Sequence, residues 1–346
     1  MKLTTSRFND CLGILGMAVS KNVTDRPITK TINLYTEDNY LYGVTINNSN
    51  NIRMRICETT EDFNVTVQYD LLNNIIKACE DEFVELTSTD KSIQIKSNLI
   101  KCKLPIFTYQ GNFPKPKTAT TNSTDFSTLS QYNAKIKSVL NKDCPVNCYK
   151  NIYFSDTDFM VTDTDNVLLV NEKYFNEPLL LDVSTVDILS TLAECNYGIE
   201  TKVMKNIQGK ILTVVSDDIE LNAISQSFDE YQYDDFKTLF DTTIKDKTDI
   251  SKGNITKAIT VASLFNDTPT LNFTNKGIFI SIKESDFSYK ISDEVCTNEV
   301  SYKIPIALFK KITTSNSDTI TISYGNTDMI KCEEDTVQVV YAVEVG

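Results

Sequence analysis

Aspartates are the residues in this sequence whose spacing comes nearest to a chemical site. Two segments with a hairpin pattern carry them, at Asp156, Asp158, Asp163 and Asp165 and at Asp217 and Asp218. Clustered carboxylates can bind Mg²⁺ or Ca²⁺. Alternating aspartates on a strand more often mark a solvated face, and the glycine and terminal glutamate of an EF-hand loop are missing. We therefore expect no metal site and no cofactor, with a carboxylate metal site as the open alternative.

The remaining catalytic chemistry is restricted by what the chain lacks. It contains no histidine, so Ser-His and Cys-His nucleophiles, imidazole bases and His-ligated zinc are excluded. No GxxxxGK[ST] or GxGxxG loop is present, and the chain has only 10 glycines. The sequence thus favours a binding or scaffold protein over an enzyme. A hydrolase or transferase that uses carboxylates alone stays open.

Cysteine usage indicates the compartment. Nine cysteines, an odd number, are scattered through 346 residues, which is typical of free thiols in a reducing environment. The closest pair, Cys144 and Cys148, has no second pair to complete a metal site, so we expect two thiols near a turn. The N-terminus lacks a signal-peptide run and no stretch is long and apolar enough to span a membrane. We expect a soluble, cytoplasmic protein with no membrane partner.

Most of the chain has the alternating pattern of β-strands. Residues 31–36 and 40–46 form the clearest predicted hairpin. Further predicted pairs are 84–86 with 93–95, 152–154 with 159–161, 211–215 with 219–224, 271–273 with 278–282, and 320–323 with 337–345.

Six segments have helical periodicity instead. Phe8, Cys11, Leu12, Leu15 and Ala18, for example, form one apolar stripe. The six helices are predicted to start near residues 5, 68, 125, 184, 250 and 305, so that a helix recurs about every 55–65 residues.

Pairing these helices predicts three units of the same order: helix, strands, helix, strands. Possible joints are residues 111–123, rich in Pro, Thr, Asn and Ser, and residues 241–249. We predict an α+β fold with domains at 1–119, 120–243 and 244–346, each of ordinary domain size. Three unrelated α+β domains are the alternative.

Charge is distributed unevenly over these elements. The net charge is -13, which by itself argues against a polyanionic partner. The six helical segments, however, hold 10 basic and 6 acidic side chains, a net of +4, and the remainder of the chain is -17. Lysine is a good helix former on solvated faces, which explains the split without any partner. A basic surface of helices that faces a polyanion is the second interpretation.

Several stretches of the sequence resemble one known family. The first is Arg26-Pro-Ile-Thr-Lys-Thr-Ile-Asn-Leu-Tyr, after an opening helix. It resembles the start of the β subunits of bacterial DNA polymerase III, in which an Arg-Pro dipeptide leads into the first long strand. The other similar stretches follow in the same order as in the family. They are Lys101-Cys-Lys-Leu-Pro-Ile with Asn112-Phe-Pro, Asn151-Ile-Tyr-Phe with Val161-Thr-Asp-Thr-Asp-Asn-Val-Leu-Leu-Val, Gln232-Tyr-Asp-Asp-Phe-Lys-Thr-Leu, and Val340-Tyr-Ala-Val-Glu-Val.

This resemblance implies three tandem DNA-clamp domains, each with two helices packed on antiparallel sheets. In the family two chains close head to tail into a ring, a homodimer that encircles double-stranded DNA without sequence preference. The ring tethers a DNA polymerase and has no chemistry of its own. Its expected role is therefore that of a sliding clamp, or processivity factor, in DNA replication. A β-rich viral structural or adhesin-like protein without a DNA role is the alternative function.

The resemblance also implies which residues contact DNA. In the family the arginine of the Arg-Pro dipeptide binds DNA, and Arg26 takes that place here. The other expected contacts rest on helix position and charge. They are Arg7, Lys21, Lys135, Lys137, Lys142, Lys252, Lys257, Lys310 and Lys311.

Family members bind a short peptide of the polymerase or of the clamp loader in an apolar groove. The matching positions here are Tyr149, Asn166, Val167, Leu168, Asp234, Thr238, Leu239, Ala342, Val343, Glu344 and Val345. The family's Gly-His-Arg is replaced by acidic and amide residues and Val167, a proline by Asp234, and an apolar residue by Glu344. We therefore expect a peptide of different sequence and a divergent clamp, for instance one encoded by a phage.

Overall fold

Antiparallel strand pairing dominates the fold, as the alternating pattern predicted. The computed structural model describes residues 1–22, 24–107, 121–204, 207–227, 229–242, 244, 246–265, 267–314 and 316–345. Within these ranges one order of elements, strand, helix, four strands, helix, three strands, occurs three times along the chain. This order agrees with the predicted repeat, while the division into three domains stays a prediction.

The first repeat begins at the N-terminus. Its strands are β1 (Lys2–Thr4), β2 (Thr31–Glu37), β3 (Tyr40–Ile46), β4 (Asn50–Glu58), β5 (Asn64–Gln68), β6 (Phe83–Ser88), β7 (Ser92–Lys96) and β8 (Lys101–Pro105). Its helices are α1 (Thr5–Leu15) and α2 (Tyr69–Lys77), with 3-10 turns η1 (Gly16–Ala18) and η2 (Pro27–Lys30). Asp70 in the first turn of α2 and Lys77 in its last turn suit the helix dipole.

The second repeat has the same order. Its strands are β9 (Asn122–Asp125), β10 (Asn151–Phe154), β11 (Phe159–Thr162), β12 (Asn166–Val170), β13 (Leu179–Asp182), β14 (Glu194–Met204), β15 (Ile207–Val215) and β16 (Ile219–Ser225). Its helices are α3 (Asn133–Val139), which follows the 3-10 turn η3 (Ser127–Tyr132), and α4 (Val183–Leu189); η4 (Asn147–Lys150) precedes β10. Helix α5 (Tyr233–Asp241) follows this repeat.

The third repeat completes the chain. Its strands are β17 (Asp246–Ser251), β18 (Thr270–Thr274), β19 (Gly277–Ile282), β20 (Phe287–Ser292), β21 (Val300–Lys303), β22 (Thr319–Tyr324), β23 (Met329–Glu334) and β24 (Val337–Ala342). Its helices are α6 (Lys252–Ala262) and α7 (Ile306–Ile312), with η5 (Lys283–Ser285) before β20. A short strand, β25 (Glu344–Val345), follows the repeat.

The repeats share their sheets. Strand β4 of the first repeat pairs with β16 of the second, which gives the eight-stranded order β5-β2-β3-β4-β16-β15-β14-β9. Strand β12 of the second pairs with β24 of the third, which gives β13-β10-β11-β12-β24-β23-β22-β17. The two remaining sheets are β1-β6-β7-β8 and β20-β19-β18-β21-β25.

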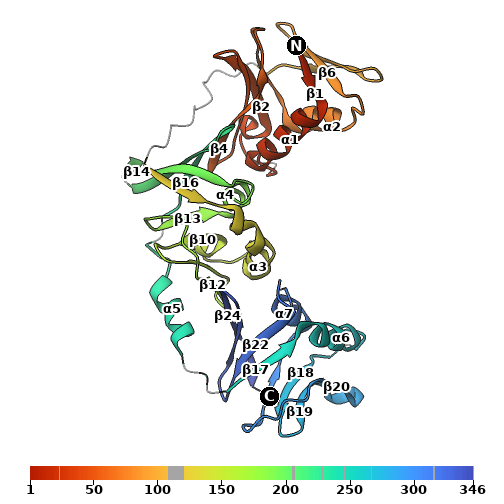
Figure 1. Ribbon diagram of the computed structural model, residues 1–346, viewed down its shortest axis with the longest axis vertical. Helices are drawn as coiled ribbons and strands as arrows, with labels where there is room; N and C mark the ends of the chain where they lie inside the picture. The colour runs from red at the N-terminus through yellow and green to blue at the C-terminus, as the bar shows by residue number, and fades with distance from the viewer. Residues whose placement is uncertain are drawn as a thin grey trace. The chain divides into compact units, whose positions relative to one another are not determined.

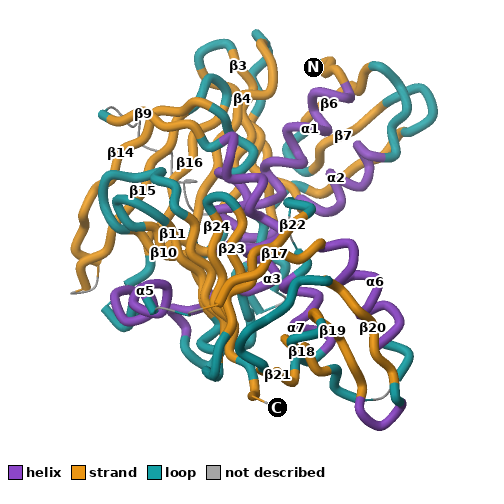
Figure 2. Tube along the Cα trace, turned by 60° about the horizontal axis from the view of Figure 1, so that its bottom comes forward, coloured by secondary structure: helices purple, strands orange, loops and turns teal. Residues whose placement is uncertain are grey.

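Because the large sheets cross the repeat boundaries, the chain divides into two compact units. Unit 1 is Met1–Ser130 with Leu181–Ser227, and unit 2 is Gln131–Leu180 with Phe228–Gly346. In unit 1, α1 and α2 pack against each other and against the strands of the first repeat. In unit 2, α6 and α7 pack against each other, and α6 packs against β17, β19 and β20 (Figures 1 and 2). Each unit thus has helices packed on antiparallel sheets, with the apolar core between them.

The predicted elements agree with the structure except in three places. The six predicted helices are present, but α5 was missed, although Tyr233, Phe236 and Phe240 have helical spacing. Residues 320–323 do not pair with 337–345, because β23 lies between β22 and β24. The predicted joint at 111–123 lies mainly outside the described residues, and that at 241–249 becomes β17 from Asp246 onward.

Candidate functional site

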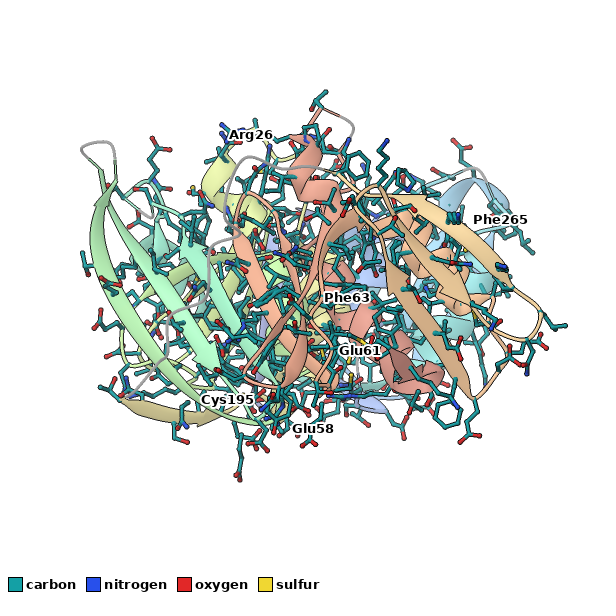
Figure 3. All side chains as sticks on the ribbon, turned by 90° about the horizontal axis from the view of Figure 1, so that it is seen from above. Arg26, Glu58, Glu61, Phe63, Cys195 and Phe265 are labelled. Atoms are coloured by element: carbon teal, nitrogen blue, oxygen red, sulfur yellow. The ribbon has the colours of Figure 1, made fainter. Side chains whose placement is uncertain are left out.

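The predicted DNA-contacting side chains lie on the first helix of each repeat, on α7 and on the segment after α1. Those that are exposed are Lys21, Arg26, Lys137, Lys142, Lys257 and Lys310, while Lys252 at the start of α6 is half-buried. Figure 3 labels Arg26 on the segment that follows α1. Pro27 begins the turn that leads from Arg26 into β2, so the Arg-Pro dipeptide precedes the strand as predicted.

Three other predicted DNA contacts have acidic partners within the chain. The Arg7 guanidinium lies 2.7 Å from Asp218, and the Lys311 ammonium lies 3.2 Å from Asp163. Both side chains keep part of their surface in solvent, so they can also reach a phosphate.

Lys135 is buried instead of facing solvent. Its ammonium lies 3.3 Å from the carboxylate of Glu334, and the side chains of the pair are 7% and 9% exposed. The same ammonium donates to the carbonyl oxygens of Lys311 and Ile312, at 3.4 and 3.3 Å, where α7 ends. Lys135 therefore neutralises the C-terminus of a helix rather than a phosphate. The sequence prediction for Lys135 conflicts with this position, and we leave it out of the proposed DNA contacts.

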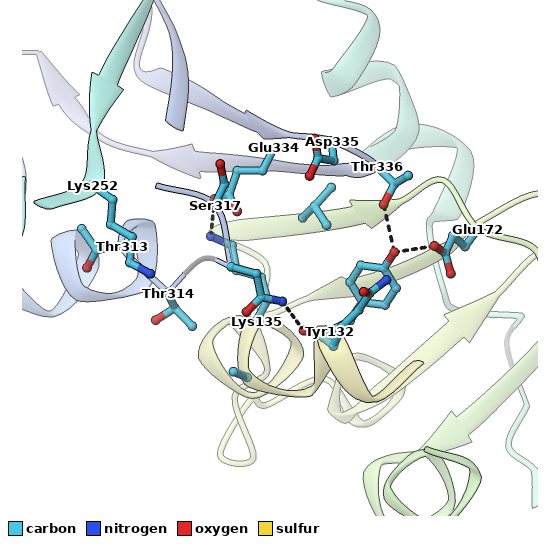
Figure 4. Close-up of a pocket in the computed structure, with 14 residues that line it drawn as sticks. Tyr132, Lys135, Glu172, Lys252, Thr313, Thr314, Ser317, Glu334, Asp335 and Thr336 are labelled. Atoms are coloured by element: carbon cyan, nitrogen blue, oxygen red, sulfur yellow. Dashed lines mark hydrogen bonds and ion pairs between the residues drawn. The ribbon is translucent and has the colours of Figure 1, made fainter. Parts of the chain in front are cut away.

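A cavity of about 360 Å³, lined mostly by residues with polar side chains, lies beside Lys135 in unit 2 (Figure 4). The Tyr132 hydroxyl there is 2.5 Å from Glu172 and 2.9 Å from Thr336. Burial, and then the hydrogen bond to Glu172, raises the pKa of Tyr132. The lining combines both signs of charge, and the Tyr132 hydroxyl is held between Glu172 and Thr336.

A second candidate site is an apolar cluster in unit 2, which we call the partner cluster. It lies on one face of β10, β11, β12 and β24 and is covered by the segment that contains α5. Its buried members are Cys144, Cys148, Tyr149, Tyr153, Met160, Val167, Leu169, Leu180, Tyr231, Phe240 and Val340. Half-buried against it are Val146, Tyr233, Phe236, Leu239 and Met329.

Aromatic contacts hold the partner cluster together. Tyr153 stacks on Tyr231 with ring centroids 5.0 Å apart, and Tyr149 meets Tyr231 and Phe236 edge-on at 5.3 and 5.5 Å. Such geometries are favourable beyond the area that the rings bury. Because five of its side chains are only half-buried, the cluster leaves apolar surface that a partner can cover.

Asp158 anchors α5 beside this cluster. Its carboxylate accepts hydrogen bonds from Tyr233 at 2.6 Å, from Lys237 at 2.8 Å and from Ser155 at 2.8 Å. Burial alone would raise the pKa of Asp158, but the bonds from Lys237, Tyr233, Ser155 and Thr157 outweigh it and lower that pKa. At the other end of α5, Lys331 donates to the Phe240 carbonyl at 3.0 Å. We call the side chains around this carboxylate the Asp158 network.

The predicted groove positions are only partly brought together. Tyr149, Val167 and Leu239 belong to the partner cluster. The others lie around it or elsewhere in unit 2. Asn166 donates a hydrogen bond to Asp163, and the Val343 amide donates one to the Asp328 carbonyl. Leu168 is buried, Asp234, Thr238 and Ala342 are exposed, and Glu344 and Val345 form β25.

Sequence reasoning missed most of the aromatic members. Tyr153, Tyr231, Tyr233 and Phe236 were not predicted as site residues, although the alternation of Val167 with Leu169 and the helical spacing in α5 were available signals. Their meeting depends on the docking of α5, which no local pattern reveals.

Among the described residues no group of three or more Cys, Asp or Glu side chains is placed to hold a metal ion. In the β10–β11 hairpin, Asp158 accepts hydrogen bonds from the Thr157 hydroxyl and the Lys237 ammonium. No helix in the described part of the chain is both long and apolar enough to cross a membrane.

No family model and no curated protein matches this sequence. Solved structures do match it along its length. The β subunit of DNA polymerase III from Thermotoga maritima is 14% identical, with a TM-score of 0.81 over 99% of this chain and 98% of that one. The corresponding β chain from Streptococcus pneumoniae is 12% identical, with a TM-score of 0.81 and the same coverage.

A third similar structure is the Helicobacter pylori β clamp bound to a DNA ligase peptide. It is 13% identical, with a TM-score of 0.78 over 99% of each chain. The resemblance predicted from the sequence motifs is thus confirmed at the level of the fold, including its α+β class. This chain has, over its whole length, the fold of the bacterial DNA polymerase III β subunit, the sliding clamp.

Proposed function

We propose that this protein is a sliding clamp that encircles duplex DNA and tethers a replicative DNA polymerase. The observation that carries the proposal is the likeness to β clamps over 99% of the chain, together with the threefold order of elements. This likeness favours a clamp over a β-rich structural or adhesin-like protein. The proposed role requires no chemistry by the protein itself, and it places the protein with DNA in the cytoplasm.

The sheet order supports ring closure by a second copy. Within the chain, the third strand of the four-strand run of one repeat pairs with the last strand of the next repeat, as β4 pairs with β16 and β12 with β24. The corresponding strands β20 and β8 each have a neighbour on one side only, among the described residues. Pairing β20 of one copy with β8 of another extends the same rule, and doing so twice closes a head-to-tail dimer.

Exposed apolar side chains lie near these two edges. Within unit 2 the first helix of one repeat, α3, contacts the second helix of the next, α7. The same rule brings α6 of one copy against α2 of the other. Leu264, just after α6, is 79% exposed, and Leu71 on α2 is 43% exposed. Burial of such side chains stabilises a dimer.

The DNA contacts in the proposed ring come from exposed basic side chains. Lys137, Lys142, Lys257 and Lys310 lie on or beside helices, and Arg26 precedes β2. We propose that these five side chains contact DNA phosphates. Secondary contacts come from Lys21, which is exposed, and from the half-buried Lys252, Arg7 and Lys311. A clamp must slide, so contacts to the backbone without base recognition suit this role.

The partner cluster is the proposed docking site for a short peptide of the polymerase or clamp loader. It contains three of the positions that match the family's groove, and it leaves half-buried apolar side chains at the surface. In the Helicobacter pylori structure the β clamp holds a DNA ligase peptide, which supports peptide binding as the mode of interaction.

The native mass and retention on DNA test the proposal together. We expect a mass near twice that of the chain, and retention on nicked circular DNA after loading that is lost when the circle is cut. Leu264→Asp should give monomers that no longer stay on circles, whereas Leu99→Asp, at an exposed apolar position in the β7–β8 turn, should behave as wild type. A monomeric wild-type protein, or equal retention on linear and circular DNA, would overturn the clamp.

A further inference from the structure

Carboxylates surround the partner cluster. Asp234 and Asp235 lie in the first turn of α5, and Asp241 is the last residue of that helix. Glu230 precedes α5, and Asp156 lies in the turn between β10 and β11. All five are exposed, and no ion pair to any of them is present in the described part of the chain. We call these five residues the acidic rim.

The rim is close enough to act on the cluster electrostatically. After burial, Glu230 contributes to raising the pKa of Cys148, and Asp235 contributes to raising that of Tyr149. For Tyr153, burial and Tyr233 come first, and Asp234, Asp158 and Asp156 raise the pKa further. Every one of these carboxylates disfavours additional negative charge at the cluster.

The nearby cations do not cancel this field. Lys237 lies 2.8 Å from the buried Asp158, and Lys331 lies 3.0 Å from Glu333 and donates to the Phe240 carbonyl. These two ammonium groups therefore have anionic or carbonyl partners of their own. Two further lysines lie near the cluster in sequence, half-buried Lys150 at the end of η4 and exposed Lys142 two residues before Cys144. They face five rim carboxylates, so the surroundings stay net acidic.

We propose that the partner cluster selects a cationic peptide, in which an aromatic or branched apolar anchor is flanked by arginine or lysine. This inference rests on the proposed function and specifies its partner. The apolar anchor covers the half-buried Tyr233, Phe236, Leu239 and Met329, and the basic flanks lie against the acidic rim. Complementary charge at a rim speeds association and rejects like-charged partners more than it raises affinity.

Three fluorescent peptides of nine residues test this selection with the full-length protein. Each contains the same leucine and phenylalanine anchors, flanked by two arginines, two serines or two glutamates. We expect the arginine peptide to bind about tenfold more tightly than the glutamate peptide at low salt, with serine between them, since each rim pair contributes modestly. The difference should shrink as salt is raised, because exposed charges are screened.

Charge reversal of the rim is the decisive variant. Asp234→Lys with Asp235→Lys should invert the order, so that the glutamate peptide binds best. Glu80→Lys with Asp90→Lys makes the same change in net charge at exposed positions of unit 1 and should leave the order unchanged. Unfolding midpoints of both double variants should match wild type, because all four side chains are exposed.

The outcomes separate this inference from the proposed function. Equal affinities for the three peptides, binding of none of them, or inversion by the control variant would each overturn the cationic selection. Retention of the wild-type protein on circular DNA is measured without these peptides, so it would still support a clamp in each case. Loss of that retention would overturn the proposed function instead.

Discussion

The two joints that carry a sheet from one repeat into the next have the same topology and different chemistry. In unit 1, where β4 pairs with β16, Arg53 bonds Glu220 at 2.7 Å and Glu37 at 2.6 Å, and its guanidinium lies 3.8 Å from the Tyr42 ring. In unit 2, where β12 pairs with β24, the buried Lys135–Glu334 pair joins α3 to the end of β23, and Lys135 also bonds the Ile312 carbonyl at the end of α7.

The strand pairing is the same at both joints although the side chains differ, so the pairing defines each joint and the side chains only stabilise it. Unit 1 uses arginine and carboxylate groups beside a half-exposed tyrosine surface, and unit 2 uses one lysine that is removed from solvent. Exposed pairs contribute little and are screened by salt, whereas breaking a buried pair leaves an uncompensated charge. The two joints should therefore respond differently to mutation, salt and pH.

The largest expected effect is at the joint of unit 2. Lys135→Met leaves the Glu334 carboxylate buried without its ammonium partner, and we expect a loss of about 3 kcal/mol in the free energy of unfolding. Urea unfolding of the full chain measures this loss. Lys135→Met with Glu334→Leu should recover much of it, because no buried charge remains. A single variant as stable as wild type would show that the pair does not secure the joint.

Arg53 should have the next largest effect, at the joint of unit 1. Its side chain is 12% exposed and contacts Glu37, Glu220 and Tyr35. We expect Arg53→Met to cost about 2 kcal/mol, since charged hydrogen bonds are lost while packing on Tyr42 is kept. The same urea titration at low and high salt checks it. A loss as large as that of Lys135→Met would remove the contrast between the joints.

The Asp158 network gives unit 2 a pH-dependent contact. Because the folded pKa of Asp158 is lowered, its stabilisation is present above the unfolded value, about 3.9, and is lost as pH falls through the folded value. We expect Asp158→Asn to cost about 1.5 kcal/mol near pH 7 and much less near pH 2. Urea midpoints over this range test it, and a gap that stays constant with pH would contradict it. Asp156→Asn, at an exposed neighbouring position, is the control.

Arg55 should have the smallest effect. Its guanidinium lies 2.5 Å from Asp218, but the two side chains are 37% and 34% exposed. We expect Arg55→Gln to cost about 0.5 kcal/mol and the cost to disappear in high salt. A cost that persists in 1 M salt would mean that this surface pair behaves like the buried pair of unit 2.

Much of the fold was predictable because its signals are local. Residues 31–36 and 40–46 alternate, and Asp38 and Asn39 take the positive φ values of 49° and 65° that a tight hairpin turn requires. The stripe from Phe8 to Leu15 predicted α1 in the same way. The match of 320–323 with 337–345 was wrong because β23 (Met329–Glu334), which lies between them in the chain and in the sheet, was not predicted.

The candidate site was less predictable than the fold. Tyr149 and Val167 were found through motif resemblance, whereas Tyr231 and Phe236 enter the partner cluster because Asp158 anchors α5. A carboxylate cluster that looked like a possible metal site in the sequence is, for Asp158, a set of hydrogen bonds to Tyr233, Lys237 and Ser155. Local spacing cannot distinguish these cases, because the partners come from a distant segment.

The sequence by itself determined six of the seven helices and twelve of the 25 strands in the described part of the chain, the absence of histidine chemistry and the concentration of basic residues on helices. The tertiary structure decided which of those residues are available. Lys135 and Lys137 are two positions apart on α3, yet Lys137 is exposed and Lys135 is buried against Glu334. The physical reason is that burial depends on what packs across a helix, and here that partner lies 199 residues away.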